Sequence, residues 1–521
     1  MGVFKTELKT PTFSGTLSIN TSLFINGEWV DPIEGGTIEV VNPSTGKVIT
    51  AVAAGSDKDV DKAVEAAWQA YRTSWGYRIP SPQRGQLLNK LADLMERDAE
   101  EFAALESLNV GKPFSASKTM DVPISISCFR YYAGWADKVH GKTMETTDAK
   151  FAYTRHEPYG VVGQIIPWNF PLAMLAWKIA PAVATGNCCV LKPSEITPLT
   201  ALKFAGLVNE AGFPPGVINI INGYGHTVGN AIALHPDIRK IAFTGSTLVG
   251  RKIQEASAKS NLKVVSLELG GKSPNIIFDD ADIDQAVKWA CVGIYTNMGQ
   301  VCTAGSRIFV QSGVYDKFLK EFTAATQARA SAIGDPFGSD TQHGPQVSQA
   351  QFERILGYLD SARKDGATIY QGGDKHGNGD GYFIQPTIIT DTKPSMKVVR
   401  EEIFGPVGVV IKFDTEEEAL RMANDTVYGL GAAVFTQNNA RAYRVAHGLE
   451  SGIVWVNCYN WSDLQLPFGG YKQSGIGREM GEYALETWVT FLAVSKAGRL
   501  TKWMDRYTQV KAVHVNLGLN L

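Results

Sequence analysis

From about residue 160 onward, short apolar runs alternate with segments of helical periodicity. Between two of these runs, apolar residues at helical spacing lead to Gly212 and Pro214, which are typical of the end of a helix. Strands that alternate with helices favour a parallel, doubly wound sheet, which binds ligands at the carboxyl ends of its strands. The runs with the length and residue types of buried strands are residues 161–166, 188–191, 217–221 and 241–243.

A second alternating segment runs from about Gly271 to Tyr471, with a strand-like run at 275–278 and a helix over 282–292. The first third of the chain is instead predicted as helices with short connections, because Ser56 and Asp59 have the spacing of a capping box. A chain of 521 residues is too long for one ordinary core. We therefore expect an α/β fold with two doubly wound parallel domains that meet near residues 268–271.

Charge and cysteine usage exclude several classes of protein. The formal net charge is -2, and basic and acidic residues are interspersed, so neither nucleic acid nor an anionic membrane is an expected partner. The sequence has no apolar stretch of about 18 residues for a membrane helix and no recognisable targeting segment, so we expect a cytoplasmic protein. The six cysteines have neither a metal-type spacing nor a dense disulfide framework, so we expect no metal site.

Two side chains outside these patterns could react. Cys302 lies in the motif GQVCTAGSR, where small neighbours allow close approach, and a thiol becomes nucleophilic once its proton is removed. Glu268 lies in LELGGKSP, directly after a strand-like run and beside paired glycines, where a cleft would open. Taken singly, a buried core cysteine and a surface glutamate are the ordinary alternatives.

Three further motifs follow predicted strands. In PWNFP, the side-chain amide of Asn169 could donate to a developing oxyanion, although a simple Asn turn is the alternative. In LKPSE, Lys192 and Glu195 could bind the hydroxyls of an adenosine ribose, and the carboxylate would repel a 2′-phosphate and so favour NAD over NADP. In FTGSTLVG, backbone N–H groups at a helix start could hold a diphosphate, although the spacing is not G-x-G-x-x-G.

Together the five motifs resemble the aldehyde dehydrogenase superfamily, in the family's order, from about Leu23 to Glu486. The motifs EEIFGP at 401–406 and PFGGYKQSG at 467–475 add to the resemblance, which is greatest to the broad-range NAD-dependent enzymes. It implies an enzyme that oxidises aldehydes to carboxylic acids. Attack by the Cys302 thiolate gives a thiohemiacetal, its hydride passes to the nicotinamide, and water hydrolyses the remaining thioester.

The resemblance also implies roles for individual residues. Cys302 is the nucleophile, Glu268 is the general base for the deacylating water, and Asn169 forms an oxyanion hole with the backbone N–H of Cys302. The implied cofactor positions are Ile166, Pro167, Trp168, Lys192, Glu195, Gly225, Gly229, Phe243, Gly245, Ser246, Gly270, Gln351, Glu402 and Phe404. The implied substrate pocket is Phe170, Met174, Trp177, Thr296, Val301, Thr303 and Phe468. This set holds no arginine, which favours an uncharged aliphatic or aromatic aldehyde; ordinary core packing is the alternative for Met174 and Trp177.

The resemblance assigns residues 1–137 and 160–270 to an NAD-binding domain and 271–476 to a catalytic domain. Residues 138–159 and 487–521 form a small β arm for oligomerisation, and we expect a homodimer or homotetramer. Residues 488–506 depart from the family's pattern, because they separate a helix like 477–486 from a final strand like 507–513 that pairs with a neighbouring subunit. An insert there threatens this assembly.

Two interpretations of residues 488–506 compete. One is a surface loop, whose length costs little entropy. The other, which we favour because long structureless loops are uncommon, is intron sequence retained in the gene model. A mature transcript that encodes residues 488–506 would contradict the intron hypothesis.

Three rival functions remain. A coenzyme-A-acylating dehydrogenase uses a thiol in place of water and so needs no base such as Glu268. A Cys–Glu amidohydrolase of the nitrilase type needs a catalytic lysine and leaves the segment from Lys192 to Glu195 without a role. A structural or inactive relative is disfavoured by the intact Cys302, Glu268 and Asn169, although the C-terminal insert leaves it open.

Overall fold

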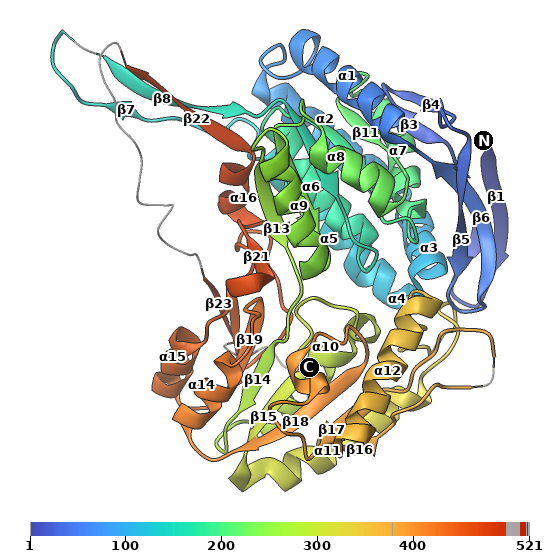
Figure 1. Cartoon of the computed structure of the whole chain (residues 1–521), viewed down its shortest axis with the longest axis vertical. Helices are drawn as coiled ribbons and strands as arrows, with labels where there is room; N and C mark the ends of the chain where they lie inside the picture. Colours follow the sequence, from blue (N-terminus) through green and yellow to red (C-terminus); the bar gives the residue numbers. More distant parts are fainter. Residues whose placement is uncertain (1, 150, 378, 496–510, 517, 519–520) are drawn as a thin grey trace.

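The computed structural model describes residues 2–149, 151–377, 379–495, 511–516, 518 and 521. Two eight-stranded sheets, one above the other in Figure 1, organise these residues. Their strand orders are β21-β13-β12-β9-β10-β11-β3-β4 and β16-β17-β18-β15-β14-β19-β20-β23. The expected fold of two parallel-sheet α/β domains is therefore confirmed.

The centre of the first sheet consists of buried parallel strands. The chain moves outward in one direction from β9 through β10 to β11, and in the other direction from β12 to β13, so the sheet has a switch point between β9 and β12. Antiparallel strands complete both edges. The strands are β9 (Val161–Ile165), β10 (Cys188–Lys192), β11 (Ile218–Ile220), β12 (Lys240–Thr244), β13 (Val264–Glu268), β3 (Leu23–Ile25), β4 (Glu28–Val30) and β21 (Gly475–Ile476).

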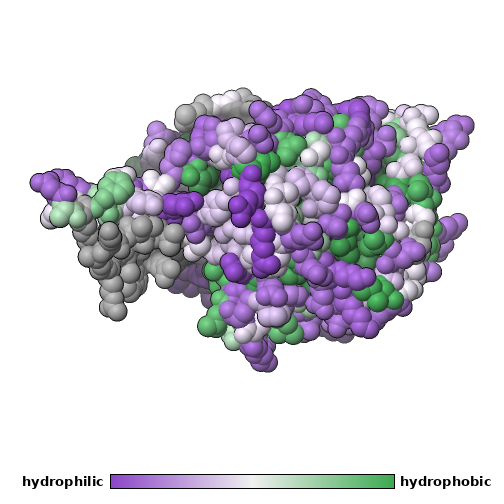
Figure 2. Space-filling model, turned by 90° about the horizontal axis from the view of Figure 1, so that it is seen from above, coloured by the Kyte–Doolittle hydropathy of each residue, from purple (hydrophilic) through white to green (hydrophobic). Residues whose placement is uncertain are grey.

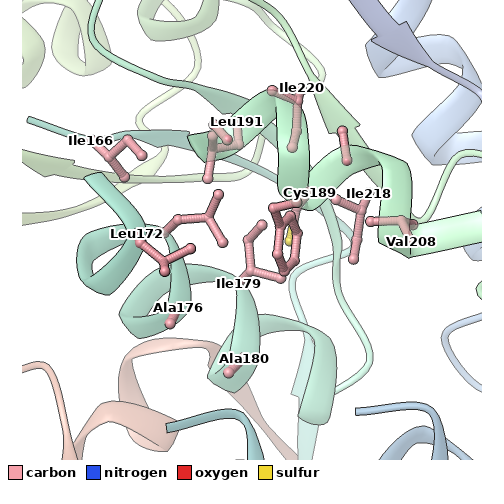
Figure 3. Packing of buried hydrophobic residues seen from close by; sticks show 14 of the residues in the cluster. Ile166, Leu172, Ala176, Ile179, Ala180, Cys189, Leu191, Val208, Ile218 and Ile220 are labelled. Atoms are coloured by element: carbon pink, nitrogen blue, oxygen red, sulfur yellow. The ribbon is translucent and has the colours of Figure 1, made fainter. Parts of the chain in front are cut away.

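Helix α6 (Pro171–Ala184) packs on this sheet, and every residue of the helix except Met174 is buried. Figure 3 shows its side chains Leu172 and Ile179 beside Leu191 of β10, with Cys189 in the same cluster. Cys189 is fully buried, as expected for a cysteine that serves as a small apolar core residue. The other helices packed around the first sheet include α7 (Leu199–Ala211), α8 (Asn230–Leu234) and α9 (Thr247–Lys259).

The second sheet is parallel except for its edge strand β16. The expected strand at 275–278 and helix at 282–292 are confirmed as β14 and α10, with shifted ends. The strands are β14 (Pro274–Ile277), β15 (Arg307–Gln311), β16 (Thr368–Gln371), β17 (Thr387–Thr390), β18 (Val407–Phe413), β19 (Gly431–Phe435), β20 (Ile453–Val456) and β23 (Ala512–Val515). Its helices include α10 (Ile283–Tyr295), α11 (Tyr315–Ser331), α12 (Gln349–Asp365), α14 (Glu416–Asn424) and α15 (Asn439–Gly448).

The prediction of helices throughout the first third is wrong before residue 55. That segment forms β1 (Val3–Lys9), β2 (Ser14–Asn20), β3, β4, β5 (Gly36–Asn42) and β6 (Lys47–Ala54). In β1, half-buried and exposed residues alternate with the period of a strand, which the prediction overlooked. The helices that follow are α1 (Asp57–Thr73), α2 (Ser81–Arg97), α3 (Ala99–Val110) and α5 (Val122–Ala133). The capping box is confirmed, since Asp59 accepts a 2.8 Å hydrogen bond from the backbone N–H of Ser56.

A three-stranded antiparallel arm protrudes from the body (Figure 1). It consists of β7 (Thr143–Met144), β8 (Ala152–Pro158) and β22 (Val489–Ser495). Strand β22 belongs to the segment predicted to be atypical, yet it pairs with β8 along all seven residues. The remainder of that segment, and the start of the strand expected at 507–513, lie outside the described residues.

Strand β23 differs from the expected arm assignment. It pairs in parallel with β20 of the same chain, where it satisfies backbone groups along that edge of the second sheet. Within the described residues, no helix is long and apolar enough to cross a membrane. The face seen in Figure 2 is mostly hydrophilic, with apolar side chains in small separate groups.

Candidate active site

The candidate site lies where the carboxyl ends of the first sheet face loops of the second. Four neighbouring strands of the first sheet, β9, β10, β12 and β13, lead at their carboxyl ends to residues 166–169, 192–195, 244–246 and 268. Hydrogen bonds join the two sides: the side-chain Nδ2 of Asn169 donates to the carbonyl of Gln300 at 2.9 Å, and the N–H of Gly271 donates to Glu402 at 2.8 Å. Residues of the two α/β units are therefore in contact where the sequence predicted a cleft.

Cys302 lies in the loop that precedes β15 and is half-buried. Burial raises the pKa of its thiol above the usual value, and the carboxylates of Glu268 and Glu402 raise it further. The backbone N–H groups of Thr303 and of Cys302 itself act on the thiol in the opposite direction. In the free chain the Cys302 thiol is therefore protonated. Two backbone donors lie close to it, and the carboxylates of Glu268 and Glu402 act on it from the two sides of the site.

This pKa predicts how Cys302 reacts in the absence of ligands. Because only the thiolate is alkylated, the rate of Cys302 modification by iodoacetamide should rise about tenfold per pH unit from pH 7 to pH 9, without a plateau. The measurement is mass-spectrometric quantification of modified Cys302 over time. A plateau below pH 8 would contradict the raised pKa.

Glu268 ends β13 and is 5% exposed. Burial raises the pKa of its carboxyl well above the usual value, and the neighbouring carboxylate of Glu479 adds to this effect, while Arg478 and Lys178 oppose it. Its Oε2 has no hydrogen-bond partner among the described residues. A carboxylate with a raised pKa and a free oxygen has the properties of a general base that works near neutral pH.

Hydrogen bonds hold both the side chain and the backbone of Asn169. Its side-chain amide donates to the carbonyl of Gln300, and its backbone carbonyl accepts a 2.9 Å bond from the side chain of Asn297. Asn297 and Met298 have φ values of 46° and 55°, a left-handed conformation that is costly for residues other than glycine and that turns the chain toward Cys302. Since the amide nitrogen carries two hydrogens, one remains available for an oxyanion.

On the cofactor side, Lys192 donates to Glu195 at 2.9 Å, and the N–H of Gly225 lies 3.4 Å from the same carboxylate. Although burial acts in the other direction, Lys192 holds the pKa of Glu195 below its usual value, so this carboxylate is charged. A Cβ added at Gly225 would meet no atom within 4 Å, so open space adjoins the pair. The charged carboxylate just past the end of β10 and the start of helix α9 at Ser246 are both compatible with the expected dinucleotide site.

Two glycines separate the cofactor side from the nucleophile. A Cβ on Gly270 would lie 2.4 Å from Oε2 of Glu402, and a Cβ on Gly271 would lie 2.3 Å from the carbonyl oxygen of Cys302. Burial raises the pKa of Glu402 to about 7. The glycines therefore allow the Glu402 carboxylate and the Cys302 backbone to approach the same stretch of main chain.

Three further cofactor positions, Gln351, Phe404 and Trp168, contact one another in succession. The side chain of Gln351 donates to the carbonyl of Phe404 at 2.8 Å, so it braces the loop that carries Phe404. The ring of Phe404 lies at 5.1 Å from that of Trp168, edge to face. Loops from the two sheets thus meet at this point as well.

The predicted substrate positions are brought together only in part. The rings of Trp177 and Phe468 lie 5.1 Å apart, and Phe468 packs against the cores of both sheets. Phe170 packs against the second core. Met174 is the only residue of α6 that is not buried, although it still packs against the core of the first sheet. Thr296, at the end of α10, is half-buried.

Sequence reasoning missed two charged residues of the site. Lys178 is fully buried in α6, where it donates to Thr244 at 2.6 Å and to Glu479. Its signal was available, because a single lysine in an apolar helix must find a partner when it is buried. Glu479, whose charge raises the pKa of Glu268, follows Arg478 in a loop and carried no comparable signal.

Residues 29–494 match the family model described as the aldehyde dehydrogenase family. Aldehyde dehydrogenases of Agaricus bisporus and Emericella nidulans are 56% and 57% identical to this chain, and the alignments cover 99% and 95% of both partners. The aldehyde dehydrogenase of Bacillus cereus, solved in an NAD+ complex, shares 46% identity over 91% of this chain and 96% of its own, with a TM-score of 0.89. An indole-3-acetaldehyde dehydrogenase of P. syringae shares 40% identity over 92% and 97%, with a TM-score of 0.90. The chain therefore belongs to the aldehyde dehydrogenase family of oxidoreductases.

Proposed function

We propose that this chain oxidises uncharged aliphatic or aromatic aldehydes to carboxylic acids with NAD, through a thiohemiacetal and a thioester on Cys302. The observation that carries the proposal is the approach of the Cys302 loop to Glu268 and Asn169 across the cleft. NAD is supported by the charged Glu195 beside open space, and by the NAD+ complex of the Bacillus cereus relative.

In the first step, the thiol of Cys302 releases its proton to solvent, the thiolate sulfur forms a bond to the aldehyde carbon, and the carbonyl electrons move to oxygen. The second N–H of the Asn169 amide and the backbone N–H of Cys302 donate to this oxyanion. Because Asn169 is already held by Gln300, little reorganisation is needed when the charge develops. The raised pKa makes the attacking thiolate a minor species of the free chain.

When bound, NAD supplies the hydride acceptor, and a thioester is left on Cys302. Glu268 then removes a proton from water as the water attacks the thioester, and the sulfur departs. The unpartnered Oε2 of Glu268 is the atom that accepts this proton. A thiolate leaves more readily than an alkoxide, which accounts for a cysteine rather than a serine at position 302.

The aromatic wall formed by Trp177 and Phe468 suits an apolar substrate. We also propose that the domains divide as 1–137 with 160–270, 271–476, and an arm of 138–159 with residues 487–495, whereas β23 belongs with the second sheet. We propose that this arm assembles copies into a dimer or tetramer. We propose a cytoplasmic location for this chain. Relatives from Mesocricetus auratus and Sus scrofa are named mitochondrial, so cell fractionation is the test of location.

The purified chain, mixed with NAD and a panel of aldehydes, should produce NADH, which is measured by its absorbance. Uncharged aldehydes should be better substrates than semialdehydes that carry a carboxylate. If NADH formation requires added coenzyme A and yields an acyl thioester, the chain is an acylating dehydrogenase instead. Folded chain that binds NAD without producing NADH from any aldehyde would identify an inactive relative.

Replacing Glu195 by glutamine should improve the use of NADP. The substitution removes a negative charge from the position assigned to the 2′-hydroxyl, so KM for NADP should fall by roughly tenfold while KM for NAD rises. Steady-state kinetics with both cofactors measure the change. Glu255→Gln, which removes an exposed carboxylate on α9, is the control and should leave both constants unchanged. If Glu195→Gln leaves the preference for NAD over NADP unchanged, Glu195 does not bind the ribose 2′-hydroxyl.

A further inference from the structure

A buried cluster of three ionisable side chains lies directly behind the Asn169 segment. Lys112 binds Glu106 at 3.1 Å and Asp121 at 2.5 Å, and all three side chains are at most 1% exposed. Glu106 belongs to α3, Lys112 follows the end of that helix, and Asp121 ends the π-helical turn η1 (Ser117–Asp121). None of the three has a role in the proposed reaction.

Two members of the cluster contact the segment that follows Asn169. Oε1 of Glu106 accepts a 3.1 Å hydrogen bond from the N–H of Leu172, in the first turn of α6. The N-cap residue Phe170 offers no side-chain cap, so the Glu106 carboxylate supplies an acceptor from another helix. The ammonium of Lys112 lies 4.1 Å from the centre of the Phe170 ring, within the range of a cation–π interaction.

Stability alone does not account for this cluster. Two carboxylates share one ammonium, burial raises the pKa of Asp121 to about 6, and Oδ2 of Asp121 has no partner among the described residues. Buried ion clusters are often no more stabilising than apolar side chains of the same volume. What an apolar replacement would lose is the acceptor for Leu172 and the cation beside Phe170.

We propose that Glu106 and Lys112 are positioning residues. They hold the turn from Asn169 to Leu172, and with it the side-chain amide of Asn169 that stabilises the oxyanion. Glu106 fixes the start of α6 through the Leu172 N–H, and Lys112 fixes the aromatic ring next to Asn169. Gln300 fixes the same amide from the second sheet, so the amide is held from both sides of the cleft. The inference rests on the proposed function, because only the proposed reaction gives the Asn169 amide an oxyanion to stabilise.

The test compares variants of the full chain in two reactions of Cys302. Oxidation of an aldehyde builds an oxyanion, whereas alkylation by iodoacetamide is a displacement at a saturated carbon and builds none. In Glu106→Ala, kcat should fall by about tenfold to a hundredfold with KM little changed, because a small displacement of a positioned group has effects of this size. The alkylation rate and the affinity for NAD should match those of the wild-type chain.

Two variants serve as controls. Glu106→Gln keeps an oxygen that can accept from Leu172 and should restore most of kcat. Asp121→Asn disturbs the same buried cluster without contacting the Asn169 segment and should keep kcat near the wild-type value, although thermal unfolding shows a loss of stability. If Glu106→Ala does not fold, Lys112→Met takes its place. This variant removes the charge beside Phe170 and should lower kcat while leaving the alkylation rate unchanged.

Equal losses of kcat in Asp121→Asn and Glu106→Ala would overturn the inference, and so would a parallel loss of alkylation rate in Glu106→Ala. Either result would mean that the cluster only maintains the fold. If the wild-type chain itself forms no NADH, the proposed function fails first. If the wild-type chain is active and Glu106→Ala matches it, the positioning role alone is wrong.

Discussion

Replacing Cys302 by serine should reduce NADH formation by about 10⁴-fold or more, because loss of a covalent nucleophile removes the whole thioester route. Serine keeps the shape of the side chain, but its hydroxyl is a far weaker nucleophile than a thiolate. The measurement is NADH absorbance with the best aldehyde of the panel. NAD affinity, measured by fluorescence titration, should be nearly unchanged, since most of the residues proposed to bind the cofactor belong to the first sheet.

The matched control is Cys291→Ser. Cys291 is also a half-buried free cysteine, on α10, and it has no part in the proposed site. This variant should retain wild-type kcat. If Cys302→Ser keeps substantial activity, the covalent mechanism is wrong, and a direct hydride transfer from a hydrated aldehyde must replace it.

Replacing Glu268 by glutamine should slow steady-state turnover by about 10²- to 10⁴-fold, the usual contribution of a general base. Formation of the thioester does not require this base in the proposed mechanism. Rapid mixing with aldehyde and NAD should therefore show a burst of about one NADH per active site, followed by a slow phase. Mass spectrometry of the quenched reaction should find the acyl group on Cys302.

The pH dependence gives a second view of the same residue. The base acts when deprotonated and its pKa is raised, so the deacylation rate of the wild-type chain should fall as pH drops through that raised value, above the usual glutamate range. Glu268→Gln should lack this limb, whereas Glu482→Gln, an exposed carboxylate on α16 (Gly481–Thr487), should retain it. Loss of both burst and turnover in Glu268→Gln would show that the base acts before the thioester forms.

The sequence predicted parallel strands of the first sheet, and β14 of the second, because those strands are continuous apolar runs; the other strands of the second sheet were not identified one by one. It did not predict the strands before residue 55, where half-buried residues alternate with exposed ones and no long apolar run occurs. The helix at α1 was recognised from a local signal, the Ser56 capping box, and the preceding residues were assigned by extension from it.

Among the site residues, Asn169, Lys192 and Glu268 were recognisable because each follows a predicted strand, and strand ends share one edge of a parallel sheet. Their contacts with the second sheet were not predictable. The bond from Asn169 to Gln300 spans 131 positions and depends on a left-handed turn at Asn297 and Met298, a conformation that asparagine adopts readily but methionine does not. The influence of Glu479 on Glu268 likewise arises only from folding.

The paired glycines at 270 and 271 have a consequence for how this enzyme can change. The Glu402 carboxylate and the Cys302 carbonyl both lie within 2.4 Å of positions where a methyl group would stand. No side chain can be added there without moving Glu402 or the main chain of Cys302, so substitutions at these glycines offer no gradual route to new activity. Under the proposed function, adaptation to a different aldehyde is open instead at Met174, which is half-buried and can vary in size.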